Sequence, residues 1–242
     1  MSLGKLYGIG VGPGDPELIS VKGARLISET KHLFVPIARI KKKSVALDIV
    51  KKYVKEGTNV KELVFPMVTD KSELNKRWDE SARIIADTLE SGADAVFLTL
   101  GDALLYSTYI YLLRSLRKIH PDVNVVTIPG ITAFSAVAAL TDFPVGEAKE
   151  PVTIVPTSDD LQAARGAIEL GGTVILMKVG KRLQNILDLL EEMDAMEGSV
   201  FVANAGMESQ RLVTDLRKLK GENDQTGYLS TILIKSQTRT KK

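Results

Sequence analysis

The 242-residue chain contains no cysteine and only two histidines, His32 and His120. The absence of thiols excludes a disulfide scaffold, a thiolate nucleophile, an iron–sulfur cluster and a cysteine-based zinc site. Two imidazoles are too few for a histidine-rich metal centre. No apolar run reaches the ~18 residues that a membrane-spanning helix needs, and the first residues lack the apolar stretch of a signal peptide. We therefore expect a cytoplasmic protein with no protein-bound metal and no membrane contact.

The net charge of +2 is too small to indicate nucleic-acid binding, and no nucleic-acid partner is expected. Positive charge is nevertheless concentrated between Lys31 and Lys61, where nine Lys or Arg residues accompany two acidic residues. The densest part is Arg39-Ile40-Lys41-Lys42-Lys43. Such a run is usually a solvated loop and helix face, whereas side chains that converge on a cleft would attract a polyanionic ligand. The charge pattern leaves both interpretations open.

Short apolar runs alternate with segments of helical periodicity along the chain. Strands are expected at residues 6–11, 32–36, 59–65, 95–100, 124–128, 152–155, 173–177, 200–203 and 228–234. Helices are expected at residues 44–53, 72–90, 131–140, 159–170 and 182–193, with Ser72 as the N-cap of the second. This alternation predicts an α/β fold with a largely parallel sheet. Because the pattern restarts after Pro144, we predict an N-terminal α/β domain at residues 1–130 and a C-terminal α/β domain at residues 131–242.

A glycine-rich turn, Gly8-Ile9-Gly10-Val11-Gly12-Pro13-Gly14-Asp15-Pro16, follows the first expected strand. Glycine lets a backbone turn sharply and approach a ligand closely. The dinucleotide fingerprint Gly-x-Gly-x-x-Gly fails here, because Pro13 or Asp15 stands where its last glycine belongs. NAD binding is therefore disfavoured, and a purely structural turn remains the alternative to a ligand-binding loop.

Two further turns leave the carboxyl ends of expected strands, where open α/β sheets bind their ligands. Gly101-Asp102-Ala103 combines a permissive backbone with a carboxylate, and Pro129-Gly130-Ile131-Thr132-Ala133 brings a hydroxyl and backbone amides to a helix start. Each is a weak signal alone, since a strand-to-helix loop or a helix cap is the commoner meaning. In the C-terminal half, Met177 and Asn204-Ala205-Gly206-Met207 also close strands.

Taken together, these five segments occur in one order across nearly the whole chain, and that ordered set resembles the tetrapyrrole (precorrin-type) methyltransferase family. Val35-Pro36-Ile37-Ala38 with its following basic residues, and the segment 104–113, are most similar to the precorrin-2 C20-methyltransferase branch. Cobalt-dependent members of that branch act on cobalt-factor II or cobalt-precorrin-2. The resemblance therefore implies methylation of C20 in corrinoid biosynthesis.

The resemblance also implies a homodimer of two α/β domains, with S-adenosyl-L-methionine in the cleft between them and S-adenosyl-L-homocysteine as product. Carried over by position, the cofactor contacts would be Pro13, Leu100, Gly101, Asp102, Leu105, Thr132, Ala133, Met177, Ala205 and Thr231, with Ser230 as the alternative to Thr231. The substrate has eight carboxylates, which gives the basic stretch a purpose. Its expected contacts are Arg39, Lys41, Lys42, Lys43 and Tyr106.

This chain departs from the family pattern at two places. The usual Gly-Asp-Pro turn reads Gly101-Asp102-Ala103. Uroporphyrinogen III methyltransferases have an aspartate just after the second strand, where this chain has Pro36, which argues against the uroporphyrinogen reaction. No catalytic residue is assigned. Tyr106, Asp102, Glu208 or water would assist loss of the meso proton.

Three alternatives remain open beside the cobalt-containing substrate. Metal-free precorrin-2 would use the same chemistry and the same site. A superfamily methyltransferase that acts on a macromolecule, such as a diphthine synthase or a ribosomal-RNA ribose methylase, would lack the 35–38 and 104–113 patterns. A tetrapyrrole carrier without catalysis would not need the Gly101-Asp102 and Thr132-Ala133 turns.

Overall fold

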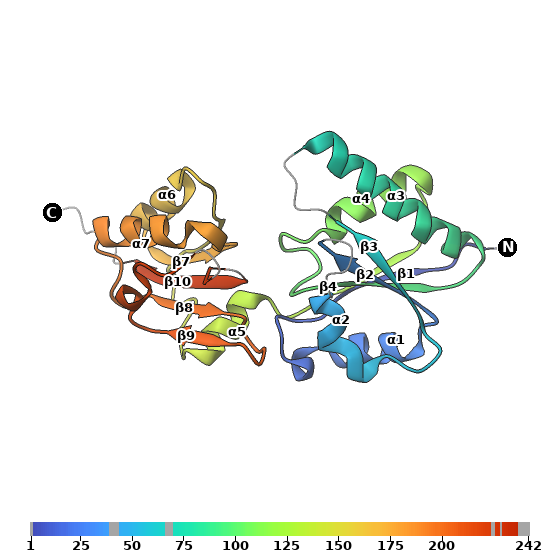
Figure 1. Cartoon of the computed structure of the whole chain (residues 1–242), viewed down its shortest axis with the longest axis horizontal. Helices are drawn as coiled ribbons and strands as arrows, with labels where there is room; N and C mark the ends of the chain where they lie inside the picture. Colours follow the sequence, from blue (N-terminus) through green and yellow to red (C-terminus); the bar gives the residue numbers. More distant parts are fainter. Residues whose placement is uncertain (1, 39–43, 66–69, 224–225, 228, 237–242) are drawn as a thin grey trace. The chain divides into compact units, whose positions relative to one another are not determined.

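The structure is a computed structural model, which describes residues 2–38, 44–65, 70–223, 226–227 and 229–236 (Figure 1). The chain divides into two compact parts, unit 1 (Met1–Thr132) and unit 2 (Ala133–Lys242). Each unit is built around one five-stranded sheet with helices on its faces, which confirms the predicted α/β class. The expected substrate contacts Arg39, Lys41, Lys42 and Lys43 lie outside the described residues.

The sheet of unit 1 has the order β3-β2-β4-β1-β5, and all its neighbouring strands are parallel. Its strands are β1 (Leu6–Gly10), β2 (His32–Ile37), β3 (Asn59–Val64), β4 (Ala95–Thr99) and β5 (Val125–Ile128). Helices α3 (Lys71–Glu90) and α4 (Tyr109–Ile119) cover one face, and α1 (Val21–Glu29) and α2 (Val45–Val50) the other (Figure 1). Because the strands are parallel, the turns that follow them gather at one edge of the sheet.

Helix α3 shows how well periodicity predicts packing and how poorly it predicts an end. Its apolar residues recur every three or four positions, and Ala82, Ile85 and Leu89 among them are fully buried against the sheet. The expected N-cap at Ser72 is wrong. Asp70 caps the helix instead, since its Oδ1 accepts from the backbone N–H of Ser72 at 2.7 Å and of Glu73 at 3.1 Å. A carboxylate that accepts from two backbone amides at the start of a helix caps it well. Its negative charge is also stabilised by the positive end of the helix dipole.

The sheet of unit 2 has the order β6-β7-β10-β8-β9 and is mixed. Its strands are β6 (Val152–Pro156), β7 (Gly172–Met177), β8 (Val200–Ala203), β9 (Arg211–Val213) and β10 (Ser230–Ser236). Strands β6 and β7 are parallel, whereas β10 is antiparallel to both β7 and β8. Helices α6 (Gln162–Leu170) and α7 (Leu183–Glu192) cover one face, and α5 (Ala133–Leu140) lies on the other (Figure 1). The carboxyl ends of β7 and β8 therefore meet the amino end of β10.

Four short 3-10 helices complete the described structure: η1 (Pro16–Leu18), η2 (Lys51–Tyr53), η3 (Gly180–Arg182) and η4 (Leu216–Leu219). Within the described ranges, no helix is both long enough and apolar enough to cross a bilayer.

Candidate functional site

The turns after β1, β4 and β5 are bonded to one another at the carboxyl edge of the first sheet. The N–H of Val11 donates to the carbonyl of Thr99 at 2.9 Å. Gly12 and Gly101 then form an antiparallel bridge, in which each N–H donates to the other carbonyl at 3.2 and 2.8 Å. We call these turns, residues 11–16, 100–108 and 129–132, the unit 1 edge.

Main-chain contact without side chains holds the centre of the unit 1 edge together. A Cβ atom at Gly10 would lie 2.6 Å from the nitrogen of Gly130 and 2.7 Å from the carbonyl oxygen of Gly101. A Cβ at Gly130 would lie only 2.2 Å from the same oxygen. Both neighbours are backbone atoms, which cannot rotate away, so only glycine fits at positions 10 and 130. The glycines of two predicted motifs thus allow three backbones to touch.

The carboxylate of Asp102 links two of these turns. Its Oδ1 accepts from the N–H of Leu104 at 2.8 Å and of Leu105 at 3.1 Å, and its Oδ2 accepts from the N–H of Gly130 at 3.0 Å. Gly101 beside it has a φ of +69°, and a Cβ there would have no protein atom within 4 Å. The backbone at Gly101 is therefore open on the side that a side chain would occupy, which suits close approach of a ligand.

Two pairs of hydroxyl groups lie next to the unit 1 edge. The hydroxyls of Thr99 and Ser107 lie 2.8 Å apart, and Ser107 Oγ also accepts from the N–H of Tyr109 at 3.1 Å. Tyr109 is fully buried and its hydroxyl lies 3.0 Å from that of Thr127. Burial raises the pKa of the Tyr109 phenol, so this group stays protonated and acts as a structural contact. Tyr106, in contrast, is exposed and has a left-handed φ of 52°.

Unit 2 has a corresponding edge where β7 and β8 end and β10 begins. Thr231 pairs with Met177, and Ser230 pairs with Ala203. The turns are cross-bonded, because the N–H of Asn204 donates to the carbonyl of Leu229 at 3.0 Å. We call the described residues of 177–180, 203–207 and 227–231 the unit 2 edge.

Three residues without glycine's freedom take left-handed backbone conformations at the unit 2 edge. They are Lys178 (φ 59°), Asn204 (φ 52°) and Leu229 (φ 47°). Such a conformation costs a residue with a Cβ roughly 1–2 kcal/mol. Strained residues of this kind are concentrated at functional sites, where the surrounding structure holds them. The strain therefore marks the unit 2 edge as a candidate binding surface.

The structure distributes the predicted cofactor residues over both edges. Pro13, Leu100, Gly101, Asp102, Leu105 and Thr132 lie in the turns of the unit 1 edge, and Met177, Ala205 and Thr231 lie at the unit 2 edge. Ala133 is the first residue of α5. Thr231 and Ala205 are buried, whereas Met177, Asp102 and Thr132 are partly exposed. Their contacts with a cofactor remain predictions.

The described part of the basic stretch contacts the turn after β1. The hydroxyl of Tyr53 donates to the carbonyl of Pro16 at 3.0 Å, and Lys52 Nζ lies 3.9 Å from a carboxylate oxygen of Glu17. The side chains of Lys52 and Glu17 are largely exposed, so this ion pair is weak. It nevertheless places positive charge next to the unit 1 edge. Among the described residues, no three His, Asp or Glu side chains gather in a way that would hold a metal ion.

Several residues that shape these edges were not predicted. The steric roles of Gly10 and Gly130 depend on which backbones meet, which no local pattern reveals. Near the unit 2 edge, Gln184 of α7 and Arg211 of β9 bond to the residues that precede β10, among them Glu222. No motif signals them, because they are ordinary polar residues on exposed surfaces.

Comparison with known proteins identifies the chain's relatives. Residues 5–220 match the family model of tetrapyrrole (corrin/porphyrin) methylases. The chain is 32% identical to the cobalt-precorrin-2 C(20)-methyltransferase of Salmonella typhimurium, over 97% of both chains. It is 32% identical to a probable cobalt-precorrin-2 C(20)-methyltransferase of Methanocaldococcus jannaschii, over 96% of both chains. It is 27% identical to a Sinorhizobium precorrin-2 C(20)-methyltransferase, over 97% of this chain and 96% of that one.

Solved structures share the fold at lower sequence identity. A cobalt precorrin-4 methyltransferase superposes with a TM-score of 0.72 at 20% identity, covering 96% of this chain and 94% of that one. The uroporphyrin-III C-methyl transferase of Thermus thermophilus, solved with S-adenosyl homocysteine, gives a TM-score of 0.64 at 18% identity, covering 96% and 97%. These likenesses support the two-unit α/β architecture.

Proposed function

The chain belongs to the tetrapyrrole (corrin/porphyrin) methylase family, and from this premise we propose that it methylates C20 of cobalt-factor II or cobalt-precorrin-2 in corrinoid biosynthesis. The observation that carries the proposal is 32% identity over 97% of the chain to a protein named for that reaction. A second relative with the same substrate in its name aligns equally completely. The proposed methyl donor is S-adenosyl-L-methionine, the compound whose demethylated form is bound in a structure of the same fold.

The residues of both edges fit a donor that is bound largely by main-chain atoms. At the unit 1 edge, the side of Gly101 that a side chain would occupy is clear of protein atoms, so a donor can approach this backbone closely beside Leu100 and Pro13. At the unit 2 edge, Met177 and Ala205 offer small or flexible apolar contacts. We propose that Asp102 acts mainly by holding the turns, since its two oxygens already accept from three amides.

S-adenosylmethionine supplies a methyl group that its sulfonium has already activated. The protein's task is then to hold the nucleophilic carbon, the methyl carbon and the sulfur in line, and such positioning supplies several kcal/mol. The C20 meso carbon of a reduced tetrapyrrole is electron-rich through conjugation, so a strong general base is not required. This chemistry suits a chain without cysteine. Of the groups considered for loss of the meso proton, exposed Tyr106 and Glu208 have side chains that reach solvent.

The decisive experiment follows the methyl group into the product. The purified chain is incubated with cobalt-factor II and S-adenosylmethionine carrying a 13C-methyl label, and the product is examined by mass spectrometry and NMR. We expect a mass gain of one labelled methyl and a new signal assigned to C20. A label at another carbon, or none, would contradict the proposal.

The metal-free substrate is the main alternative, because the Sinorhizobium relative is named for precorrin-2. Parallel initial rates on cobalt-containing and metal-free substrate distinguish the two, and the cobalt-containing one should react faster. We further propose that the protein is a cytoplasmic homodimer. Light scattering should then give a mass of twice the 26.4 kDa of one chain.

A further inference from the structure

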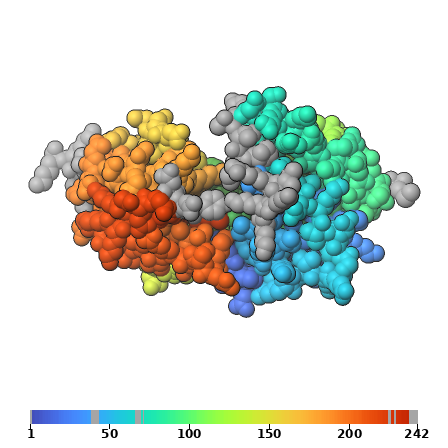
Figure 2. All heavy atoms as spheres, in the orientation of Figure 1, coloured from blue at the N-terminus to red at the C-terminus, as the bar shows by residue number. Residues whose placement is uncertain are grey.

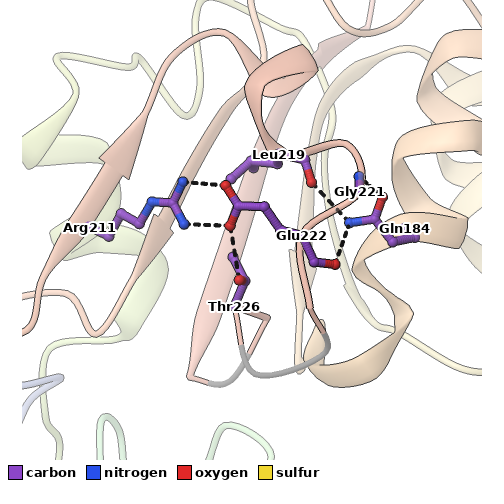
Figure 3. A network of polar contacts seen from close by, with 6 residues as sticks. All are labelled: Gln184, Arg211, Leu219, Gly221, Glu222 and Thr226. Atoms are coloured by element: carbon purple, nitrogen blue, oxygen red, sulfur yellow. Dashed lines mark hydrogen bonds and ion pairs between the residues drawn. The ribbon is translucent and has the colours of Figure 1, made fainter.

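A polar network holds the described residues between η4 and β10, which are residues 220–223, 226–227 and 229 and which we call the segment (Figure 3). Arg211, on the edge strand β9, forms a bidentate pair with Glu222, in which both nitrogen–oxygen distances are 2.5 Å. The hydroxyl of Thr226 donates to the same carboxylate at 2.9 Å. Figure 3 shows the Glu222 carboxylate between the guanidinium and this hydroxyl. The carboxylate thus connects β9 to the residue that precedes Gly227.

Gln184 on α7 holds the same segment from the opposite side. Its Nε2 donates to the carbonyl of Leu219 at 2.9 Å and to that of Glu222 at 3.3 Å. Its Oε1 accepts from the N–H of Gly221 at 2.9 Å (Figure 3). One amide side chain therefore bonds three backbone groups of a segment that has no partner strand of its own at these residues.

The far end of the segment is part of the unit 2 edge. The carbonyl of Gly227 accepts from the N–H of Gly180 at 2.8 Å and from the hydroxyl of Ser230 at 2.7 Å. A Cβ at Gly227 would lie only 1.9 Å from the carbonyl oxygen of Gly180, so the two backbones are in tight contact. Together with the bond from Asn204 to Leu229, this ties the turns after β7 and β8 to the segment. A shift of the segment must therefore move both turns.

The network lies at the surface, so its contribution to global stability is small. The side chains of Arg211 and Glu222 are 45% and 26% exposed, and exposed ion pairs stabilise a fold by at most about 1 kcal/mol. The space-filling view shows the orange-red residues around β9 on the outer surface of unit 2 (Figure 2). A bidentate pair fixes direction as well as distance, which a single contact does not. Its geometry thus suits positioning better than stabilisation.

We infer that Arg211, Glu222 and Gln184 are positioning residues that set the backbone of the unit 2 edge for binding of the methyl donor. The inference rests on the proposed function, because it takes the donor's adenosyl-containing product as the ligand of that edge. These residues act through the described residues of the segment, by way of the Thr226–Glu222 hydrogen bond and the turns bonded to Gly227 and Leu229, and none of them is required to touch the ligand. They lie outside the five motifs and add supporting side chains to the predicted site.

The test compares Glu222→Gln with a matched variant of an equivalent pair. In Glu222→Gln, one oxygen becomes an NH2 group that faces a guanidinium donor of Arg211 in either orientation and, at the Oε2 position, the Thr226 hydroxyl as well. The control is Glu192→Gln, because Arg165 and Glu192 form the same bidentate pair at 3.0 and 2.7 Å on the α6–α7 surface of unit 2. Both variants lose one exposed ion pair, but only the first touches the segment.

Two measurements are made on each variant and on the wild-type chain. Calorimetry gives the Kd for S-adenosylhomocysteine, and hydrogen exchange gives the protection of the Gly180 and Asn204 amides, whose acceptors lie on the segment. We expect Glu222→Gln to raise the Kd about three- to tenfold and to lower both protection factors. Glu192→Gln should leave both unchanged, and Arg211→Lys, which keeps the charge, should lie between wild type and Glu222→Gln.

The outcomes separate this inference from the proposed function. Wild-type affinity in Glu222→Gln, with a loss of stability equal to that of Glu192→Gln, would contradict the positioning role and leave the methyltransferase proposal intact. A wild-type chain that gave no heat with S-adenosylhomocysteine would contradict the proposed donor and, with it, the inference. For the full reaction, Glu222→Gln should raise the KM for the donor more than it lowers kcat.

Discussion

The two edges hold their turns by different physical means. At the unit 1 edge, backbones touch directly at Gly10 and Gly130, and a single carboxylate, that of Asp102, joins two turns. At the unit 2 edge, backbones also touch, at Gly180 and Gly227, but side chains, above all Arg211 and Glu222, hold the segment to which the turns are bonded. A backbone contact leaves no room for an added atom. An exposed ion pair can be altered at small cost, and its strength depends on the charge of its partners. Substitution of Gly10 or Gly130 should therefore lower stability abruptly, whereas substitution of Arg211 or Glu222 should change the unit 2 edge gradually.

The largest effect is expected from Gly10→Ala at the unit 1 edge. The new methyl group would lie 2.6 Å from the Gly130 nitrogen and 2.7 Å from the Gly101 oxygen, so the strand or the turn must move. We expect the free energy of unfolding in urea to fall by about 3 kcal/mol, the upper range for overpacking, and binding of S-adenosylhomocysteine to be lost.

Gly166→Ala is the matched control for that substitution. Gly166 lies within α6, where an added Cβ has no protein atom within 4 Å. Removing glycine from a helix interior stabilises it by up to about 1 kcal/mol, so this variant should be as stable as wild type or more so. If Gly10→Ala behaved like Gly166→Ala, the steric account of the unit 1 edge would be wrong.

Asp102→Asn should have the next largest effect, because it replaces one acceptor with a donor. Whichever way the amide turns, its NH2 group faces the N–H of Gly130 or those of Leu104 and Leu105. Leaving such a group unsatisfied costs about 1–3 kcal/mol. We expect reduced stability in urea and faster hydrogen exchange at Gly130.

Asp94→Asn provides the comparison for Asp102→Asn. The carboxylate of Asp94 accepts from one backbone N–H, that of Lys5, at 2.7 Å, and an asparagine oxygen can keep this bond. Its effect on stability should be smaller, and Gly130 should keep its protection. Equal losses in the two variants would show that charge alone, and not the three-amide geometry, matters at position 102.

Acid should weaken the unit 2 edge by a smaller amount. The hydrogen bonds from Arg211 hold the pKa of Glu222 below its ordinary value of 4.5. A carboxyl group whose pKa is lowered by folding contributes fully above its ordinary pKa, and this contribution is lost as the pH falls through the lowered value. The Kd of wild-type chain for S-adenosylhomocysteine should therefore rise in acid by up to about fivefold more than that of Glu222→Gln. If the Kd values of the two proteins changed with pH in the same way, this role of the Glu222 carboxylate would be refuted.

Replacing Lys41, Lys42 and Lys43 with alanine should have the smallest effect on binding of the methyl donor. These residues lie outside the described ranges, so the prediction rests on the charge pattern. The KM for the tetrapyrrole should rise about tenfold or less at low salt, and the difference should shrink as salt screens the carboxylates. The Kd for S-adenosylhomocysteine should not change. An unaltered KM at low salt would rule out the electrostatic role.

Periodicity predicted most elements of the fold, and its failures have local causes. Strands β1 to β8 and β10 lie within one or two residues of their expected positions, because most of them are buried strands that form compact apolar runs, although the edge strand β3 is largely exposed. Helix α4 was not predicted, since the segment from Tyr109 follows directly on a turn that was read as a motif. Helix α1 was missed as well, although Ser20 caps it through the N–H of Gly23.

The sequence predicts those parts of the candidate site that lie in turns at the carboxyl ends of parallel strands. This rule brought the turns at Gly101 and Gly130 to one edge. It could not reveal that Asp102 bonds to a glycine 28 residues later, or that Arg211 and Glu222 meet. Those contacts depend on how a loop returns past an edge strand, and their residue types are common on any surface. The cofactor contacts themselves remain predictions at both edges.

The position of β10 has a consequence for how the protein is made. Among the described residues this strand comes last along the chain, yet it lies between β7 and β8 in its sheet. During synthesis, unit 1 can complete its sheet while later residues are still being added, since domains generally fold in the order in which they emerge. Unit 2 instead leaves two strand edges unpaired until the last strand leaves the ribosome, and open edges invite aggregation. A stalled ribosome or a premature stop codon ahead of residue 230 should thus yield an insoluble second half beside a folded first.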